Sequence, residues 1–176
     1  MDYYDKVINF VYKLLEYEPL LYTKYIKTLI IDIFSSYTHI FIYEKNLNQI
    51  RKAITTFDDL KKKLSIEDYI PSYALVDKVK GDYWFYCKDY NTAISYYEHA
   101  LELFEKNEPK IAPVLFNTGC AYFFMGNKPK AKKYLNRCIN EYNNVIMQKN
   151  IYGFTPNVFS INNKIYNVKK LLKQLS

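Results

Sequence analysis

The residues best suited to chemistry are few and far apart in this chain. The two histidines, His39 and His99, are sixty residues apart. The cysteines Cys87, Cys120 and Cys138 form no CxxC pair and share no metal-site spacing with a histidine. The sequence contains no glycine-rich phosphate loop, no HExxH motif and no GxSxG motif. It therefore predicts no catalytic residue, no metal site, no cofactor and no enzymatic activity.

The same cysteines indicate a reducing compartment. An odd number of widely spaced cysteines is typical of free thiols in a cytoplasmic protein. The N-terminus lacks the basic region and the following apolar stretch of a signal peptide. The apolar run Leu29–Tyr43 is too short to span a bilayer and contains Asp32 and His39, so a buried helix is expected there. These features predict a cytoplasmic protein with no membrane span.

One pattern of residue sizes occurs twice at a fixed distance along the chain. Small, aromatic, small, large and small residues return thirty-eight positions later with the same spacings. The first set is Gly81, Trp84, Ala93, Tyr97 and Ala100, and the second is Gly119, Tyr122, Ala131, Leu135 and Cys138. A period of roughly 20–50 residues indicates stacked structural repeats.

Each copy has the pattern of a helix hairpin. Ala74–Tyr86 and Thr92–Phe104 have helical composition on either side of a polar turn, and Ala112–Phe124 and Lys130–Asn143 repeat this arrangement. A mid-helix glycine costs about 1 kcal/mol relative to alanine, so two glycines at one repeat position indicate a close helix crossing. Axes about 8–10 Å apart leave no room there for a large side chain. Because strand-like alternation is scarce, we expect one all-α domain over residues 1–176.

The two copies resemble the tetratricopeptide repeat (TPR) family over about residues 70–144. The segments KGDYWFYCKDYNTAISYYEHALEL and LFNTGCAYFFMGNKPKAKKYLNRCI follow the family pattern of small, aromatic and alanine positions. Asp77 departs from it, because a large apolar residue is expected four positions before Gly81. Leu115 fills the equivalent place before Gly119. The resemblance implies a right-handed superhelix of TPR-like helix hairpins, in which the first helix of each hairpin lines a concave surface.

A degenerate third copy is predicted at residues 31–63, before the two clear repeats at 74–108 and 112–144. The five spacings are kept there by Thr38, Phe41, Ile50, Ile54 and Phe57. Two of the small positions have become large, so this copy matches the pattern less well than the two clear repeats.

The two ends of the chain are expected to close the stack. Residues 1–34 have the pattern of an N-terminal helix pair, divided at Glu18-Pro19 because proline disfavours helix in the residue before it. Residues 156–175 carry one apolar face. This is the pattern of a C-terminal capping helix, which a repeat stack needs for solubility.

By the same resemblance, a peptide-binding groove is expected on the first helices. The predicted contact residues are Lys78, Asp82, Tyr86, Phe116, Asn117 and Cys120, and the degenerate copy adds Asp32, Ser35, His39 and Tyr43. Asn117 is the central candidate, because a side-chain amide pairs with both the N–H and the C=O of a peptide backbone. Aromatic area with a few polar groups predicts a non-catalytic adaptor that binds a protein or peptide segment.

Two narrower interpretations of this groove also come from the resemblance. Some TPR domains clamp a partner's C-terminal carboxylate, and Lys78 and Asn117 are placed to do so, but the third repeat lacks the second basic pair. The repeat length and Asn117 also resemble bacterial peptide-pheromone receptors. Because the chain shows no effector domain, that resemblance implies a truncated, regulatory peptide sensor.

Positive charge is concentrated in the C-terminal part of the chain. Residues 1–109 contain 14 Lys and Arg against 17 Asp and Glu, a net charge of −3. Residues 110–176 contain 11 basic residues and a single acid, Glu141, a net charge of +10. The alternative function is therefore binding of nucleic acid or of an acidic protein through a basic surface. Nucleic acid is the less favoured partner, because Lys outnumbers Arg ten to one there.

The N-terminal helices carry apolar residues on more than one face, among them Phe10, Leu14 and Leu29. A terminal hairpin has a neighbour on one side only, and an exposed apolar patch usually marks an interface. A homodimer through these helices is one expectation. The other is that the helices bury this surface against the degenerate copy.

Overall fold

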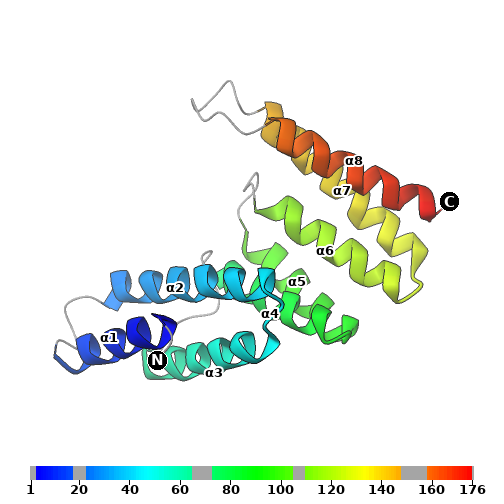
Figure 1. The fold of residues 1–176 in the computed structure, drawn as a ribbon. Coiled ribbons are helices and arrows are strands. Elements are labelled where there is room, and N and C mark those ends of the chain that lie inside the picture. The colour runs from blue at the N-terminus through cyan, green and yellow to red at the C-terminus, as the bar shows by residue number, and fades with distance from the viewer. Residues whose placement is uncertain (1–2, 18–22, 65–72, 105–109, 148–157, 176) are drawn as a thin grey trace.

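Helices alone build every part of the chain that the structure describes. The computed structural model describes residues 3–17, 23–64, 73–104, 110–147 and 158–175. Within these ranges there are eight α-helices and no strand (Figure 1). They are α1 (Tyr3–Tyr17), α2 (Thr23–Tyr43), α3 (Leu47–Leu64), α4 (Ala74–Tyr86), α5 (Tyr90–Leu103), α6 (Ile111–Phe124), α7 (Lys128–Met147) and α8 (Val158–Gln174). The predicted all-α stack of helix hairpins is confirmed.

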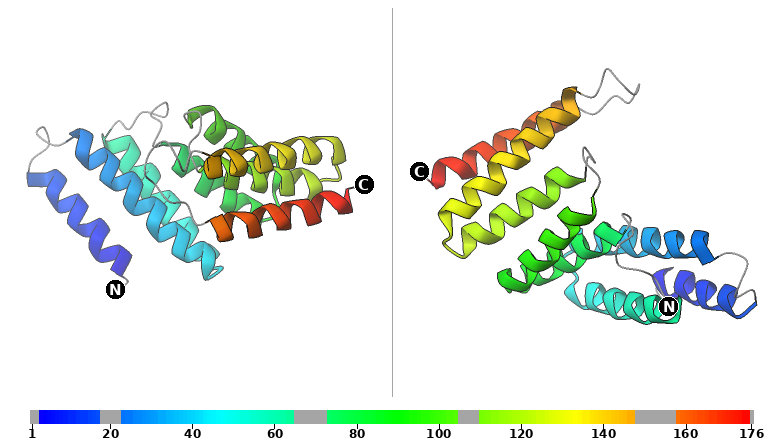
Figure 2. Two further views of the ribbon diagram at one scale, coloured as in Figure 1. Left: turned by 90° about the horizontal axis from the view of Figure 1, so that it is seen from above. Right: turned by 180° about the vertical axis from the view of Figure 1, so that it is seen from behind.

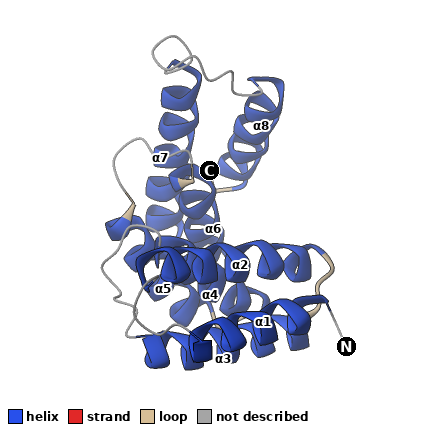
Figure 3. Ribbon diagram, turned by 90° about the vertical axis from the view of Figure 1, so that its left-hand side faces the viewer, coloured by secondary structure: helices blue, strands red, loops and turns tan. Residues whose placement is uncertain are grey.

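The helices pair into hairpins that stack side by side. α4 packs against α5 and α6 against α7, and the contact between α5 and α6 joins the two hairpins. At one end α2 contacts α3 and α4, and at the other end α8 lies along α7 (Figure 1). In Figure 3 helices α1–α3 lie across the direction of α6–α8, so the stack twists along its length. α1 and α8 therefore lie at opposite ends of the molecule (Figure 2).

The repeated glycines mark the places where the two helices of a hairpin touch. A Cβ atom added at Gly81 would lie 2.5 Å from ring carbons of Tyr97. One added at Gly119 would lie 2.7 Å from Cγ of Leu135. Carbon atoms pack at about 3.5–4.0 Å, so neither hairpin has room for even a methyl group. The close crossing predicted from the sequence is present in both hairpins, and the large residue of the repeat pattern closes it.

The three hairpin turns share one backbone conformation. Lys45, Lys88 and Gly126 have positive φ angles of 56°, 63° and 75°. Each is followed by a residue whose side-chain oxygen accepts a hydrogen bond of 3.1–3.2 Å from the backbone N–H three positions later. These residues are Asn46, Asp89 and Asn127. Asn and Asp are favoured helix N-caps for this reason. The shared turn supports counting α2 and α3 as a third hairpin of the same kind.

Helix α2 differs from the sequence expectation, because it is one continuous helix from Thr23 to Tyr43. The N-terminal pair was predicted to end at Phe34 and the degenerate copy to begin at residue 31, as if two helices met there. No proline or glycine interrupts this stretch. The hydroxyl of Thr38 donates a 2.6 Å hydrogen bond to the carbonyl of Phe34 within the helix. Helix α2 therefore belongs both to the N-terminal helix pair and to the hairpin with α3.

Helix α8 covers the apolar side of the last hairpin. Ile161, Ile165 and Val168 are buried in one cluster with residues of α6 and α7. The predicted capping helix began at residue 156. Residues 156–157 and the predicted break at Glu18-Pro19 lie outside the described residues. Among the helices that are described, none is both long and apolar enough to span a bilayer.

Candidate functional site

The side of the stack formed by the first helices contains two adjoining hollows, which together are called the groove below. The larger hollow has a volume of about 540 Å³ and is lined by Asp32, Ser35, Ser36, His39, Leu75, Lys78, Val79, Lys110, Pro113 and Lys164. The smaller has a volume of about 230 Å³ and is lined by Pro113, Phe116, Asn117, Tyr142, Lys164, Asn167 and Val168. Pro113 and Lys164 line both hollows. The groove thus brings together α2, α4, α6, α7 and α8.

The structure separates the six predicted contact residues into two groups. Lys78 lines the larger hollow, and Phe116 and Asn117 line the smaller. Asp82, Tyr86 and Cys120 line neither hollow. From the degenerate copy, the larger hollow includes Asp32, Ser35 and His39 but not Tyr43. The groove is therefore displaced toward the N-terminal halves of α4 and α6 relative to the surface expected from the sequence.

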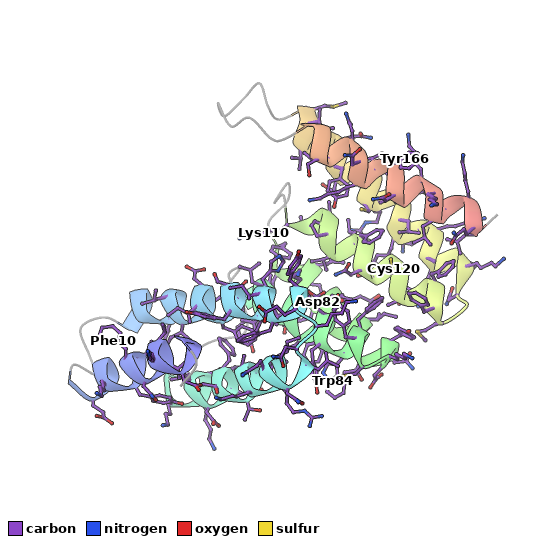
Figure 4. All side chains as sticks on the ribbon, in the orientation of Figure 1. Phe10, Asp82, Trp84, Lys110, Cys120 and Tyr166 are labelled. Carbon is purple, nitrogen blue, oxygen red and sulfur yellow. The ribbon has the colours of Figure 1, made fainter. Side chains whose placement is uncertain are left out.

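Asp82 is buried and holds neighbouring side chains in place. This corrects the prediction that it contacts a ligand. It is 4% exposed and lies in the middle of the stack (Figure 4). Its Oδ1 accepts hydrogen bonds of 2.8 Å from the hydroxyl of Tyr97 and from Nδ2 of Asn117. Its Oδ2 forms an ion pair with Nζ of Lys78 at 2.5 Å. One carboxylate on α4 thereby ties together α4, α5 and α6.

This network limits what Lys78 and Asn117 can offer to a ligand. The charge of Lys78 is neutralised by Asp82, and its side chain is only 16% exposed. A carboxylate clamp built on Lys78 is therefore not supported by the geometry. Asn117 donates one amide hydrogen to Asp82, and this bond fixes the orientation of the amide. The second amide hydrogen and the amide oxygen are the groups it can present in the smaller hollow.

The other two predicted contact residues lie away from the groove. Burial raises the pKa of the Cys120 thiol from its ordinary value of 9.0 to about 12, and a neutral thiol is a poor nucleophile. Tyr86 is exposed at the end of α4. Phe85, beside it, packs edge-on against Phe124 of α6, with ring centroids 5.9 Å apart. Tyr86 thus belongs to an aromatic edge that joins the two hairpins.

A comparison with known protein families matches residues 65–143 to the tetratricopeptide repeat. This segment belongs to the TPR family. The match covers α4, α5, α6 and most of α7, which are the helices that carry the five-position pattern. TPR hairpins are scaffolds for protein–protein interaction, so the family indicates a protein-binding role. No curated protein matches the chain.

Asp77, which departs from the TPR pattern, has a partner in the next helix. Its Oδ2 lies 2.6 Å from Nδ1 of His99 on α5. The carboxylate is buried, whereas the imidazole is 46% exposed. A buried carboxylate needs a hydrogen-bonding or charged partner, and His99 supplies one from the surface. The departure at Asp77 is thus matched by a second unusual residue in the same TPR hairpin.

Two basic segments meet at the far end of the TPR region. Nζ of Lys164, early in α8, lies 5.9 Å from the ring centroid of Tyr142, late in α7, so the two helices run antiparallel (Figure 1). This arrangement brings together the exposed cations Lys128, Lys130, Lys132, Lys133, Arg137, Lys169, Lys170 and Lys173, called the basic end below. Within the described residues, no carboxylate forms an ion pair with any of them.

Sequence reasoning missed nine residues that line the groove: Ser36, Leu75, Val79, Lys110, Pro113, Tyr142, Lys164, Asn167 and Val168. Lys110 and Pro113 lie at the beginning of α6 and share the larger hollow with residues of α2. Lys164 lies on α8, outside the TPR match. The sequence did indicate where Lys164 would lie. A helix that caps the last hairpin occupies the position that the first helix of a further repeat would have, and it therefore borders the groove.

Proposed function

We propose that this protein is a non-catalytic adaptor that binds a segment of a protein partner in the groove. The observation that carries the proposal is the continuity of the two hollows, which share Pro113 and Lys164. An uninterrupted groove crossed by first helices suits an extended peptide or a single helix. Catalysis has no support in the groove, since its one histidine, His39, forms no cluster with a cysteine or a second histidine there.

The chemistry of the groove suits recognition of main-chain groups as well as side chains. Ser35, Ser36 and Asn117 offer hydroxyl and amide groups, which both donate and accept hydrogen bonds. Leu75, Val79 and the aromatic ring of Phe116 supply apolar area. A regulatory peptide sensor would use the same surface. The free cysteines Cys87, Cys120 and Cys138 fit the proposed cytoplasmic location.

A displayed library of random twelve-residue peptides tests the proposal. Selection would be run in parallel on the wild-type chain, on Ser36→Trp and on Ser95→Trp. Ser36 lines the larger hollow, so tryptophan there fills it, whereas Ser95 is an exposed residue of α5 outside the groove. The expected result is enrichment of peptides by the wild type and by Ser95→Trp, with loss of binding by Ser36→Trp. Equal enrichment by all three proteins would contradict groove binding.

The basic end supports a second candidate function, which is binding of an acidic protein or of nucleic acid. The specific observation is the convergence of cations from α7 and α8 at one place without paired carboxylates. Lysines act as point charges toward phosphates and carboxylates alike. Contacts of this kind release counterions, so affinity falls steeply as salt rises. Groove binding through apolar and main-chain contacts responds weakly to salt.

Charge reversal distinguishes this function from groove binding. A variant with Lys132, Lys133, Lys169 and Lys170 changed to Glu would be compared with one that reverses Lys6, Lys13, Lys45 and Lys62, which are also exposed. Fluorescence titration would use polyglutamate and a single-stranded RNA as probes. Binding that is lost in the first variant alone, with a steep salt dependence, is the expected result. If both variants bind equally, the basic end is only a solvated surface.

We further propose self-association through the N-terminal helices. Phe10 of α1 is 59% exposed, and Leu29 and Ile40 of α2 are 47% and 51% exposed. Phe10 lies on α1, at one end of the molecule (Figure 4). Light scattering across the micromolar range should show a dimer mass that reverts to monomer in the variant Phe10→Ser/Leu29→Ser. A monomer mass for the wild type at every concentration would contradict the dimer.

A further inference from the structure

The smaller hollow is an apolar pocket with a polar rim. The rings of Phe116 and Tyr142 line it together with Val168 of α8, which is almost fully buried. Its volume of about 230 Å³ lies below the roughly 300–1,000 Å³ of pockets that enclose whole small-molecule ligands. The space therefore suits a single large side chain. In protein interfaces such pockets receive the anchor residue of the partner.

The rim of this pocket carries a positive charge toward the larger hollow. Lys164 lines both hollows, and its ammonium lies over the ring of Tyr142. Lys110, three residues before Pro113, also lines the larger hollow. The charged groups that line the larger hollow are Asp32, Lys78, Lys110 and Lys164, with His39 beside them, and Lys78 is paired with Asp82. Lys164 is thus the charged residue that lines both hollows where they meet.

We infer that this pocket selects partners in which a large apolar side chain is followed or preceded, within two positions, by an acidic residue. The apolar side chain enters between Phe116 and Tyr142. The carboxylate meets the ammonium of Lys164 at the junction of the hollows. Asn117, held by Asp82, and Asn167 on the rim pair with the main chain of the anchor. The inference rests on the proposed groove function and adds the chemistry of the partner to it.

The geometry limits how far the acidic residue can lie from the apolar anchor along the bound segment. Pro113 and Lys164 border both hollows, so a segment that leaves the pocket passes Lys164 at once. An extended chain advances about 3.3 Å per residue. A carboxylate within two positions of the anchor is therefore within reach of Lys164, whereas one farther along the segment lies in the larger hollow beside Asp32.

Four variants, two of them controls, separate the apolar and the charged parts of this recognition. Asn167→Trp places an indole at the mouth of the pocket without changing its buried walls. Asn162→Trp is the matched control, because Asn162 is an exposed asparagine of α8 outside both hollows. Lys164→Glu reverses the charge at the junction, and Lys62→Glu makes the same change at an exposed lysine of α3, outside both hollows and the basic end. Circular dichroism would first establish that all four variants fold like the wild type.

The same library of twelve-residue peptides would be selected on the wild type and on these four variants. The wild type and both controls should enrich peptides in which Leu, Met, Phe or Trp lies within two positions of Asp or Glu. Asn167→Trp should bind a selected peptide at least tenfold more weakly, measured by fluorescence anisotropy. Lys164→Glu should keep the apolar preference and lose the acidic one.

The outcomes distinguish this inference from the groove function itself. Peptides that are lost on Ser36→Trp but bind Asn167→Trp like the wild type would overturn the anchor pocket and leave the groove intact. An acidic preference that survives Lys164→Glu would overturn the assigned role of Lys164. A library from which the wild type enriches nothing would contradict both proposals.

Discussion

The two TPR hairpins have the same backbone arrangement and different interiors. In α4–α5, Gly81 packs against Tyr97, whose hydroxyl reaches the buried carboxylate of Asp82. In α6–α7, Gly119 packs against Leu135, and Cys120 occupies the place of Asp82. The first hairpin contains buried charge, whereas the second is apolar at the same positions. The repeat therefore fixes which residues touch and leaves open whether they touch through polar or apolar groups.

The difference shows how this chain combines a scaffold with a binding surface. The apolar hairpin gains stability mainly from burial of apolar surface at these positions. The polar hairpin places a carboxylate between three helices, and this carboxylate orients Lys78 and Asn117 along the groove. A buried ion pair contributes little net stability but penalises the loss of either partner. The four predictions below compare equivalent positions of the two hairpins, beginning with the largest expected effect.

The largest contrast is expected between Asp82→Ala and Cys120→Ala. Removing Asp82 leaves Lys78, Tyr97 and Asn117 without their common partner, and loss of one member of a buried pair costs about 3–5 kcal/mol. Cys120→Ala removes one sulfur from a half-buried position and should cost about 1 kcal/mol or less. Urea unfolding followed by circular dichroism measures both. Equal losses would show that Asp82 is not the centre of the network.

The next contrast is expected between Gly81→Ala and Gly119→Ala, which test the two close helix crossings. The new methyl group would meet the ring of Tyr97 in one hairpin and Cγ of Leu135 in the other. Overpacking costs about 1–3 kcal/mol, and alanine returns about 1 kcal/mol of helix propensity. Both variants should be destabilised, Gly81→Ala more strongly because a hydrogen bond to Asp82 holds the ring. Thermal unfolding at higher temperature than wild type in either variant would refute the crossing.

A smaller contrast is expected at His99 and its counterpart Arg137, thirty-eight residues later. His99→Ala removes the partner that lies 2.6 Å from the buried carboxylate of Asp77, and an under-satisfied buried group costs about 1–3 kcal/mol. Arg137→Ala is an exposed change and should stay within about 0.5 kcal/mol of wild type. Adding Asp77→Leu to His99→Ala should restore the lost stability, because leucine is what the TPR pattern has at Leu115. A double-mutant cycle by urea unfolding would detect the coupling, and additive effects would contradict it.

The smallest contrast lies in the turns, where Lys88 and Gly126 share a left-handed conformation. This conformation costs a residue with a Cβ atom about 1–2 kcal/mol. Lys88→Gly relieves this cost, but glycine loses more conformational entropy on folding than lysine does, which offsets part of the gain. The expected net effect is a stabilisation of about 0.5–1 kcal/mol. Gly126→Ala should destabilise it by about 1 kcal/mol. Thermal unfolding gives both signs, and a loss of stability in Lys88→Gly would contradict the shared turn.

The sequence predicted those features that depend on repeated contacts and missed those that depend on single ones. The period of thirty-eight residues predicted the hairpins and the crossings at Gly81 and Gly119, because a crossing restricts residue size at a fixed position. It could not predict that Asp82 is buried, since an aspartate on a first helix is usually solvated. The partner His99 is twenty-two residues away on another helix, and no periodic pattern connects it to Asp77. The groove residues on α8 required the position of the cap, which the repeat does not specify.

Binding of a protein segment in the groove is the central prediction for this molecule. The decisive measurement is site-specific photocrosslinking with a selected peptide, with the photoreactive residue placed in turn at Ser36 in the larger hollow and at Asn140 on the exposed face of α7. We expect a peptide adduct from position 36, competed by unlabelled peptide, and none from position 140. An adduct from position 140 alone, or equal adducts from both positions, would contradict it.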